Sequence, residues 1–312
     1  MFSYAMKRIL IGLMTVYAIA TITFFAMHAV PGDPLMRAKV VNEVVRQNLE
    51  TKYGLNQPLF VQYVTFLTNM LKGDFGISFT QQNRSVNDII REHFPVSALL
   101  GLVAIITAAL GGIVGGAVAA IRRNQWPDRT IMSLVILFVS VPSFVFAAFA
   151  QVGLAEIKKK FGVEILPVAG WGTLAHLILP GLILGLGTMA FLARLMRSSM
   201  LEVVHQDYIR TAKAKGVAPI KIFIRHQLRN AVLPVITFLG PAVAAITTGG
   251  FVAEIVFAIP GLGRYFVQAV QQLDYTVIMG LTVFYGTYLV IVVIIVDIIY
   301  GFIDPRIRIA GA

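Results

Sequence analysis

The chain has 312 residues, 57% of them hydrophobic and only 13% charged, which is about half the charged share of an ordinary soluble domain. With a mean hydropathy of +0.80, this composition excludes a disordered chain, a coiled coil and an ordinary soluble enzyme, and it favours a membrane-embedded protein. The sequence has no cysteine, so disulfides, cysteine-bound metals and thiolate nucleophiles are excluded, and we expect no cofactor. The net charge is +11. In so apolar a chain we expect the excess lysines and arginines to lie on one side of the membrane, and we expect no nucleic-acid partner.

Six apolar segments follow one another along the chain, and each is long enough for a helix to cross a membrane, which takes about 20 apolar residues. They cover residues 9–30, 96–121, 130–155, 174–196, 231–257 and 278–303. The first follows Lys7 and Arg8, is longer than the core of a signal peptide and continues into Pro31, so we expect an uncleaved helix. The sequence therefore predicts an all-α, polytopic membrane protein with six transmembrane helices.

The predicted spans divide the chain into three parts. Residues 1–30 form an N-terminal segment with the first transmembrane helix, and residues 31–95 form an external cap loop with short helices. Residues 96–312 form a five-helix transmembrane core that carries a cytoplasmic hairpin at about 205–230.

A helical pattern lies within the external loop. Pro58 is expected to begin a helix that ends at Gly73. Its apolar stripe consists of Val61, Val64, Leu67, Met70 and Leu71. A segment of this size buries little core by itself, so we interpret it as a small cap on the helix bundle, too small to enclose a large solute.

Basic residues are concentrated in the segments that would share one side of the membrane with the amino terminus. These are Lys7, Arg8, Arg122, Arg123, Arg129, Arg194, Arg197, Arg210, Lys213, Lys215, Lys221, Arg225, Arg229, Arg306 and Arg308. Cytoplasmic loops carry an excess of lysine and arginine, so both termini are predicted to be cytoplasmic. Residues 158–160, three lysines, are a local exception.

Small residues and prolines within the spans predict how the helices pack. Glycines spaced four residues apart allow helix backbones to approach closely in lipid. Such pairs occur among Gly111, Gly112, Gly115 and Gly116, and again at Gly181 and Gly185. Prolines inside spans, which are expected to kink or break their helices, are Pro142, Pro180 and Pro241.

The most informative stretch is the cytoplasmic hairpin. Gly216 and Pro219 predict a turn between two helices. The second helix is expected to pack through an apolar stripe of Ile220, Phe223, Ile224 and Leu228. Its opposite face carries the basic residues Lys221, Arg225 and Arg229.

Two interpretations of the hairpin are open on its pattern alone. An amphipathic hairpin can lie on the inner leaflet with its cations on lipid phosphates. Alternatively, it is a docking element for a cytoplasmic partner, which would approach closely at the small residues Ala212, Ala214 and Gly216.

The hairpin also resembles a known family. The run from Arg210 to Gly216, RTAKAKG, followed by Leu233 and Pro234, is similar to the coupling loop of the permeases of ATP-binding-cassette importers. Arginine and threonine at its first two positions are typical of the oligopeptide and dipeptide branch. Other segments that resemble this branch, in order, are residues 31–34 (PGDP), 53–55 (YGL), 73–76 (GDFG), 94–97 (FPVS), 260–263 (PGLG) and 304–306 (DPR).

This resemblance implies a type I importer permease fold and the first, B-type, permease subunit of a prokaryotic peptide importer in the cytoplasmic membrane. The implied partners are a second permease, two cytoplasmic ATPase subunits, an external solute-binding protein, a di- or oligopeptide and the lipid membrane. The residues that would contact the ATPase are Asp207, Tyr208, Arg210, Thr211, Ala212, Lys213, Ala214, Lys215, Gly216 and Pro219. Nickel, glutathione or another small solute is the alternative cargo.

The chain has no phosphate-binding loop, because no Gly-Lys dipeptide occurs in it. We therefore expect a non-catalytic membrane subunit whose ATP hydrolysis takes place on separate chains. The other classes considered are a membrane scaffold and a self-contained secondary transporter with Glu254 and Asp297 as an ion relay. No inverted repeat supports the transporter.

Residues near the predicted external mouth are candidates for the solute pathway or its gate. They are Glu254, Gly249, Gly250, Pro260, Gly261 and Gly263. An ionisable residue in a span indicates function by default, and for Glu254 a gate or helix-anchoring role is weighed against solute contact. For Asp297 we favour a structural partner, such as an arginine.

Overall fold

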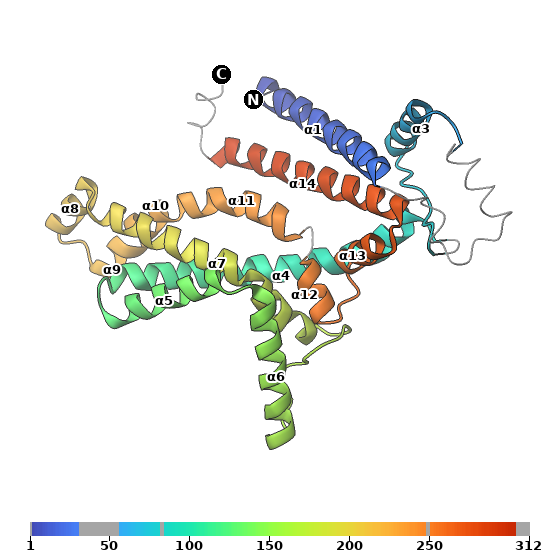
Figure 1. The fold of residues 1–312 in the computed structure, drawn as a ribbon. Coiled ribbons are helices and arrows are strands. Elements are labelled where there is room, and N and C mark those ends of the chain that lie inside the picture. Colours follow the sequence, from blue (N-terminus) through green and yellow to red (C-terminus); the bar gives the residue numbers. More distant parts are fainter. Residues whose placement is uncertain (1, 31–55, 82–83, 248–249, 304–312) are drawn as a thin grey trace. The chain divides into compact units, whose positions relative to one another are not determined.

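The structure is a computed structural model that describes residues 2–30, 56–81, 84–247 and 250–303. The expected all-α class is confirmed in these ranges, where the extended structure is an isolated bridge between Ile77 and Ser85 (Figure 1). The helices are α1 (Phe2–Ala29), α3 (Leu59–Leu71), α4 (Val86–Ile121), α5 (Trp126–Ser140), α6 (Ser143–Phe161), α7 (Ala175–Val204), α8 (Asp207–Ala214), α9 (Pro219–Ile222), the π-helix η1 (Phe223–Leu228), α10 (Arg229–Ala231), α11 (Leu233–Thr247), α12 (Phe251–Val256), α13 (Leu262–Gln272) and α14 (Tyr275–Ile303).

The helices form two compact units. Unit 1 consists of Met1–Ser97 with Pro260–Ala312, and unit 2 consists of Ala98–Ile259. The last two helices, α13 and α14, group with α1 in unit 1. The expected division into an amino-terminal span, an external loop and a five-helix core stays a prediction.

Within unit 1, α1 and α14 pack side by side in opposite directions (Figure 1). Gly12 lies against Val290 and Ile294, whereas Gly286 lies against Ile19, so the two helices are antiparallel. Near the start of α1, Arg8 forms an ion pair with Asp297, with 2.9 Å between Nη1 and Oδ2. The expected structural partner of Asp297 is confirmed, and the beginning of α1 lies beside the last turns of α14.

One end of unit 1 is held together by Asp274, whose side chain is almost fully buried. Its carboxylate accepts hydrogen bonds from the hydroxyls of Ser78 and Thr80 and from the backbone N–H groups of Phe79 and Thr80. It also accepts a bond from the N–H of Val277 in the first turn of α14. Asp274 thus caps α14 and holds residues 78–80 to it.

Unit 2 is organised by close packing of α4 on α7. A Cβ atom added at Gly112 would lie 2.6 Å from the Cβ of Leu192, and one at Gly116 would strike the carbonyl oxygen of Ala193. On α7, a Cβ at Gly185 would lie 2.6 Å from the carbonyl oxygen of Ala104. The packing predicted from the glycine spacing is therefore confirmed.

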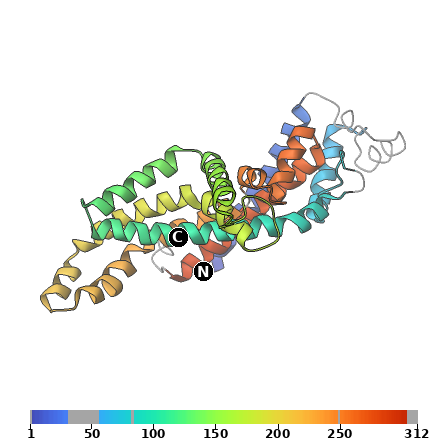
Figure 2. The same ribbon diagram turned by 90° about the horizontal axis from the view of Figure 1, so that it is seen from below.

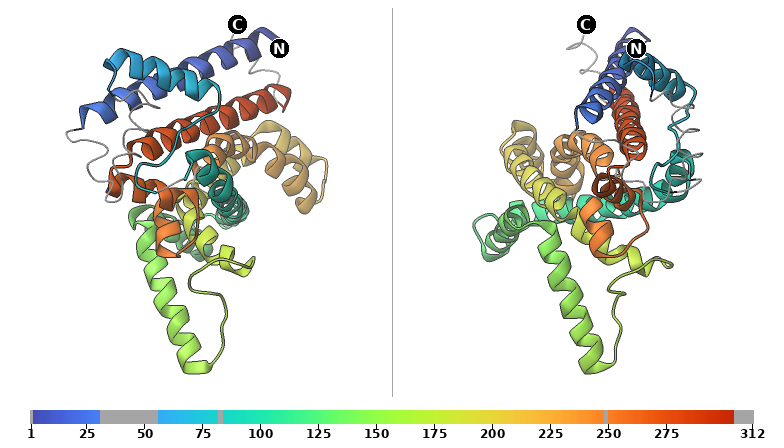
Figure 3. Two further views of the ribbon diagram at one scale, coloured as in Figure 1. Left: turned by 90° about the vertical axis from the view of Figure 1, so that its right-hand side faces the viewer. Right: turned by 45° about the vertical axis from the view of Figure 1, so that its right-hand side comes forward.

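In the described part of the chain, four helices are each long and apolar enough to cross a membrane, namely α1, α4, α7 and α14. Two further spans arise if each bent pair is one crossing, α5 with α6 and residues 219–231 with α11. The expected third span is not one straight helix: α5 and α6 meet at 107° next to Pro142, which confirms the break expected there (Figure 3). The expected fifth span is likewise divided between α11 and α12.

Candidate partner-docking hairpin

The hairpin continues from α7 and begins with α8, and it extends beyond the neighbouring ends of α4 and α5 within unit 2 (Figure 2). Gly216 ends α8 in the left-handed conformation, with φ of +69°. The N–H of Gly216 donates to the carbonyl of Lys213, and the N–H of Val217 donates to that of Ala212. This pair of bonds is the Schellman arrangement, so the turn predicted at Gly216 has a specific backbone basis.

A small apolar core holds the two arms of the hairpin together. Ile209, Ala212 and Ile222 are buried in it, and Val217 packs against them. Ala212 is 8% exposed, so its small side chain serves the core of the hairpin. Contact of a partner with Ala212 stays a prediction, because only a small part of this side chain is exposed.

The second arm departs from the expected pattern. Ile220 and Ile224 are 65% and 56% exposed, whereas Ile222, which lay outside the predicted stripe, is buried. Ile220 and Ile222 lie in the short helix α9, and the π-helix η1 that follows it has a wider turn, so a stripe drawn at α-helical spacing across the two does not stay on one face. The predicted apolar stripe is therefore wrong in two of its positions.

The outward surface of the hairpin is basic and solvent-exposed. Arg210, Lys213 and Lys215 are exposed on the first arm and its turn, together with Asp207, Thr211, Ala214 and Pro219. On the second arm the exposed cations are Lys221, Arg225 and Arg229. Tyr208 connects the arms, because its hydroxyl accepts a hydrogen bond of 3.1 Å from the side chain of Asn230.

A groove of about 650 Å³ opens beside the hairpin. Its walls are Ile121, Lys213, Val217, Pro219, Ile220, Ile222, Phe223 and Gln227. Ile121 is the last residue of α4 and is distant in sequence from the others, so no local pattern could have predicted this groove. It places an exposed apolar surface next to the cations of the hairpin.

An ion pair secures the helix that carries the hairpin. Arg197 on α7 donates to Asp128 at the start of α5 through two bonds, Nε–Oδ1 of 2.6 Å and Nη2–Oδ2 of 2.8 Å. The backbone N–H of Asn124 donates to the same carboxylate at 2.8 Å. Asp128 is 3% exposed, so this bidentate pair connects the turn between α4 and α5 to the part of α7 that leads into the hairpin. Sequence reasoning missed it, although an aspartate at the edge of an apolar segment was an available signal.

The predicted pathway residues of unit 2 are packed against neighbouring helices. Glu254 on α12 has no exposed surface. A Cβ atom at Gly250 would lie 2.6 Å from Leu184 on α7. Gly249 lies outside the described residues. A pathway role for these residues stays a prediction.

The other pathway candidates belong to unit 1, at the start of α13. The carbonyl of Pro260 lies 2.8 Å from Nδ1 of His93, and the N–H of Leu262 donates to the hydroxyl of Ser97 at 2.8 Å. Gly261 and Gly263 are buried in this junction with α4. The observed contacts are those of helix packing, and a gate here also stays a prediction. Among the described residues, no group of three or more histidine, aspartate or glutamate side chains could hold a metal ion.

These features define a polytopic helical membrane protein with an exposed basic hairpin between two of its apolar helices. A family model described as the binding-protein-dependent transport system inner membrane component matches residues 112–309. The model of the amino-terminal part of the membrane component matches residues 1–101. The chain therefore belongs to the family of inner membrane components of binding-protein-dependent transport systems.

Named relatives match over nearly the whole chain. The dipeptide transport system permease protein DppB of Bacillus subtilis is 47% identical, over 98% of this chain and 97% of its own length. The oligopeptide transport system permease proteins OppB of Haemophilus influenzae and Escherichia coli K12 are 43% and 39% identical, each over 99% of this chain and 100% of the relative. A solved structure of the inward-facing MetNI methionine transporter is 19% identical, with a TM-score of 0.49, over 72% of this chain and 97% of that chain.

Proposed function

We propose that the chain is a permease subunit of an ATP-driven importer of di- and oligopeptides. The assignment of peptides as the cargo rests on full-length similarity to relatives named for dipeptide and oligopeptide transport. Family membership supports a non-catalytic membrane subunit, with ATP hydrolysis on separate chains. A second permease subunit, two ATPase subunits and an external solute-binding protein complete the assembly.

The hairpin is the contact with the ATPase in this proposal. Its exposed cations suit an acidic rim, and the adjacent apolar groove suits an inserted side chain of the partner. Because α8 directly follows α7 and the Arg197–Asp128 pair ties α7 to α5, a displacement of the hairpin is passed to two helices together. Rocking of packed helices of this kind produces alternating access.

The membrane orientation follows from the same proposal. With the hairpin in the cytoplasm, the positive-inside rule assigns both termini to the cytoplasmic side. The pairing of Arg8 with Asp297 supports this, since it puts the start of α1 and the last turns of α14 at one end of unit 1. The protein then lies in the inner membrane of a prokaryote with the junction at Asp274 outside.

Uptake of labelled di- and oligopeptides tests the proposal in a strain that lacks this chain and in the same strain with the chain restored. We expect uptake only in the restored strain, and no uptake when the partner ATPase carries an inactivated nucleotide site. Uptake of nickel or glutathione instead of peptides would show that the cargo is different, and the protein would still be a permease of an ATP-driven importer. Transport by the purified chain alone under a proton gradient would establish the secondary transporter and overturn the proposal.

A further inference from the structure

Helix α3 has an apolar outward face. Its outer stripe consists of Phe60, Val64, Thr68 and Leu71, one helical face at spacings of three and four residues. Phe60 and Leu71 are 73% and 84% exposed. The hydroxyl of Thr68 donates to the carbonyl of Val64 at 2.8 Å, so the polar group of the stripe is satisfied inside the helix. No charged residue occurs from Leu59 to Leu71.

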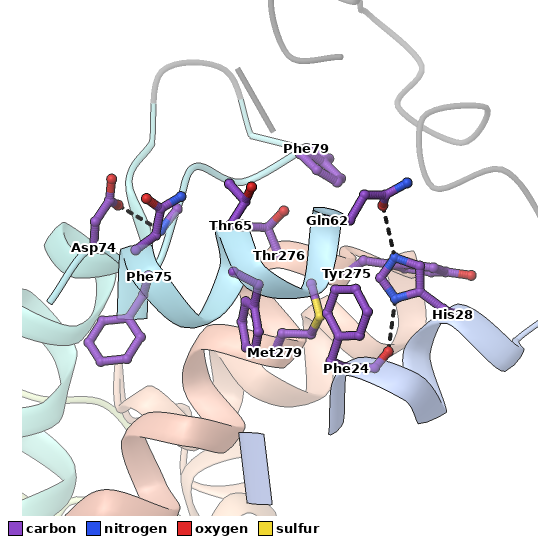
Figure 4. Close-up of a pocket in the computed structure, with 13 residues that line it drawn as sticks. Phe24, His28, Gln62, Thr65, Asp74, Phe75, Phe79, Tyr275, Thr276 and Met279 are labelled. Atoms are coloured by element: carbon purple, nitrogen blue, oxygen red, sulfur yellow. Dashed lines mark hydrogen bonds between the residues drawn. The ribbon is translucent and has the colours of Figure 1, made fainter. Parts of the chain in front are cut away.

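The inward face of α3 carries the polar side chains of the helix together with Phe66, which packs on Phe24 of α1. Gln62, Thr65 and Asn69 line a small cavity of about 70 Å³ that α3 shares with α1 and α14 (Figure 4). Gln62 Oε1 lies 3.2 Å from Nε2 of His28 on α1. A helix at a water-exposed surface buries its apolar face and exposes its polar face. Helix α3 departs from this rule by exposing an apolar, uncharged face, and the apolar stripe expected to pack into a cap faces outward at Val61, Val64 and Leu71.

Contacts with α1 give the depth of α3. The hydroxyl of Tyr63 lies 2.7 Å from that of Thr21 and 3.1 Å from that of Tyr17. Both partners belong to the candidate span Ala5–Ala29. At 1.5 Å per residue, Thr21 is about 12 Å and Tyr17 about 18 Å along the helix from Ala29, well inside a hydrocarbon layer of about 30 Å. Helix α3 thus lies beside the membrane-spanning part of α1.

We propose that α3 is immersed in the outer leaflet of the bilayer, with Phe60, Val64 and Leu71 in contact with lipid acyl chains. With 13 residues it reaches about 20 Å, too short to span, so it occupies one leaflet. The hydroxyls of Tyr63, Thr21 and Tyr17 satisfy one another, as polar groups in hydrocarbon must. Lys72 at its end extends its charge to the headgroups.

Lipid is favoured over a protein partner because the neighbouring helix α1 also has an exposed apolar surface. Leu13, Tyr17, Ile22 and Phe25 of α1 are each 46% exposed or more and belong to a candidate span. Gln62 contacts His28 near the outer end of the candidate span, and the hydroxyl of Tyr63 reaches inward to Thr21 and Tyr17, so α3 lies along the outer part of that span. Assignment to the outer leaflet rests on the proposed cytoplasmic amino terminus.

Nitroxide accessibility tests the immersion in the assembled transporter in lipid nanodiscs. Since the chain has no cysteine, Val64→Cys and Leu71→Cys can be labelled singly against cysteine-free partners. Leu13→Cys on α1 is the matched membrane control, and Glu164→Cys, an exposed position after α6 and outside the docking surface, is the water control. We expect labels at 64 and 71 to collide more with oxygen than with a nickel chelate, as at 13, and the reverse ratio at 164.

The alternative outcomes are distinct. Greater access to the nickel chelate at 64 and 71 would place α3 in water, and low access to both reagents would place it under a protein partner. Either result overturns the immersion. Labelling of Lys213→Cys by a membrane-impermeant thiol reagent from the outside would instead overturn the orientation in the proposed function and leave the depth result intact.

Discussion

Two short helices outside the continuous spans, α8 and α3, have opposite polarity. In α8 the apolar Ile209 and Ala212 are buried, while Arg210 and Lys213 are exposed. In α3 the polar Gln62 and Asn69 line the interior cavity, while Phe60 and Leu71 are exposed. The comparison shows that both helices are amphipathic and that their surroundings decide the outward face. A protein partner in water suits α8, and lipid suits α3.

The largest effect is expected where the base of the hairpin is anchored. Asp128→Ala leaves Arg197 without its carboxylate and the N–H of Asn124 without an acceptor. Loss of one partner of a buried ion pair costs about 3 kcal/mol, so the unfolding midpoint in an SDS–mixed micelle titration should fall. The exchange of charges in Asp128→Arg with Arg197→Asp is the control, and an unchanged midpoint in Asp128→Ala would refute the anchoring role.

The next effect compares a lysine introduced on the proposed lipid-facing side of α3 with a lysine introduced on the water-facing side of α8. Val64→Lys on α3 should destabilise the assembled protein by about 2.5 kcal/mol, the cost of a lysine within hydrocarbon. Ala214→Lys on the exposed face of α8 should change stability by less than about 0.5 kcal/mol. Thermal unfolding in nanodiscs measures both. Equally small losses of stability in both variants would show that α3 and α8 do not lie in different environments.

A smaller effect is expected within α8 itself. Ala212→Leu overfills the core made with Ile209 and Ile222, which should cost about 2 kcal/mol. Ala214→Leu, two residues further on and exposed, is the matched variant and should be nearly neutral. Limited proteolysis of the hairpin distinguishes them, and equal protection of both variants would contradict the assigned core.

Gly216→Asn is expected to change stability least and to reduce transport most. Gly216 has φ of +69° and no atom within 4 Å of an added Cβ, and Gly162 at the end of α6 has the same φ and the same open space. Asparagine tolerates this conformation, so Gly216→Asn and Gly162→Asn should both fold. Peptide uptake and peptide-stimulated ATPase activity should fall only in Gly216→Asn, because only that side chain enters the docking surface.

Helix breaks, turns and close packing between helices were predictable from the sequence, since they depend on residue type and spacing. The glycine pairs of α4 and α7, the break at Pro142 and the turn at Gly216 are confirmed. The buried position of Ile222 was not predictable, because it depends on packing against Ile209 and Ala212 of the other arm and on a change of helix type after α9. The Asp128–Arg197 pair joins residues far apart in the chain. The direction of α3 depends on the medium around it, which periodicity does not reveal.

Photo-crosslinking from the hairpin tests the central claim most directly. A benzophenone is attached to Ala214→Cys in the assembled transporter, with Glu164→Cys, which lies after α6 in the predicted external segment, as control. We predict that illumination joins the label at 214 to the ATPase subunit and that the label at 164 gives no such product. Adducts of the label at 214 with lipid alone would contradict the account and favour a hairpin that rests on the inner leaflet.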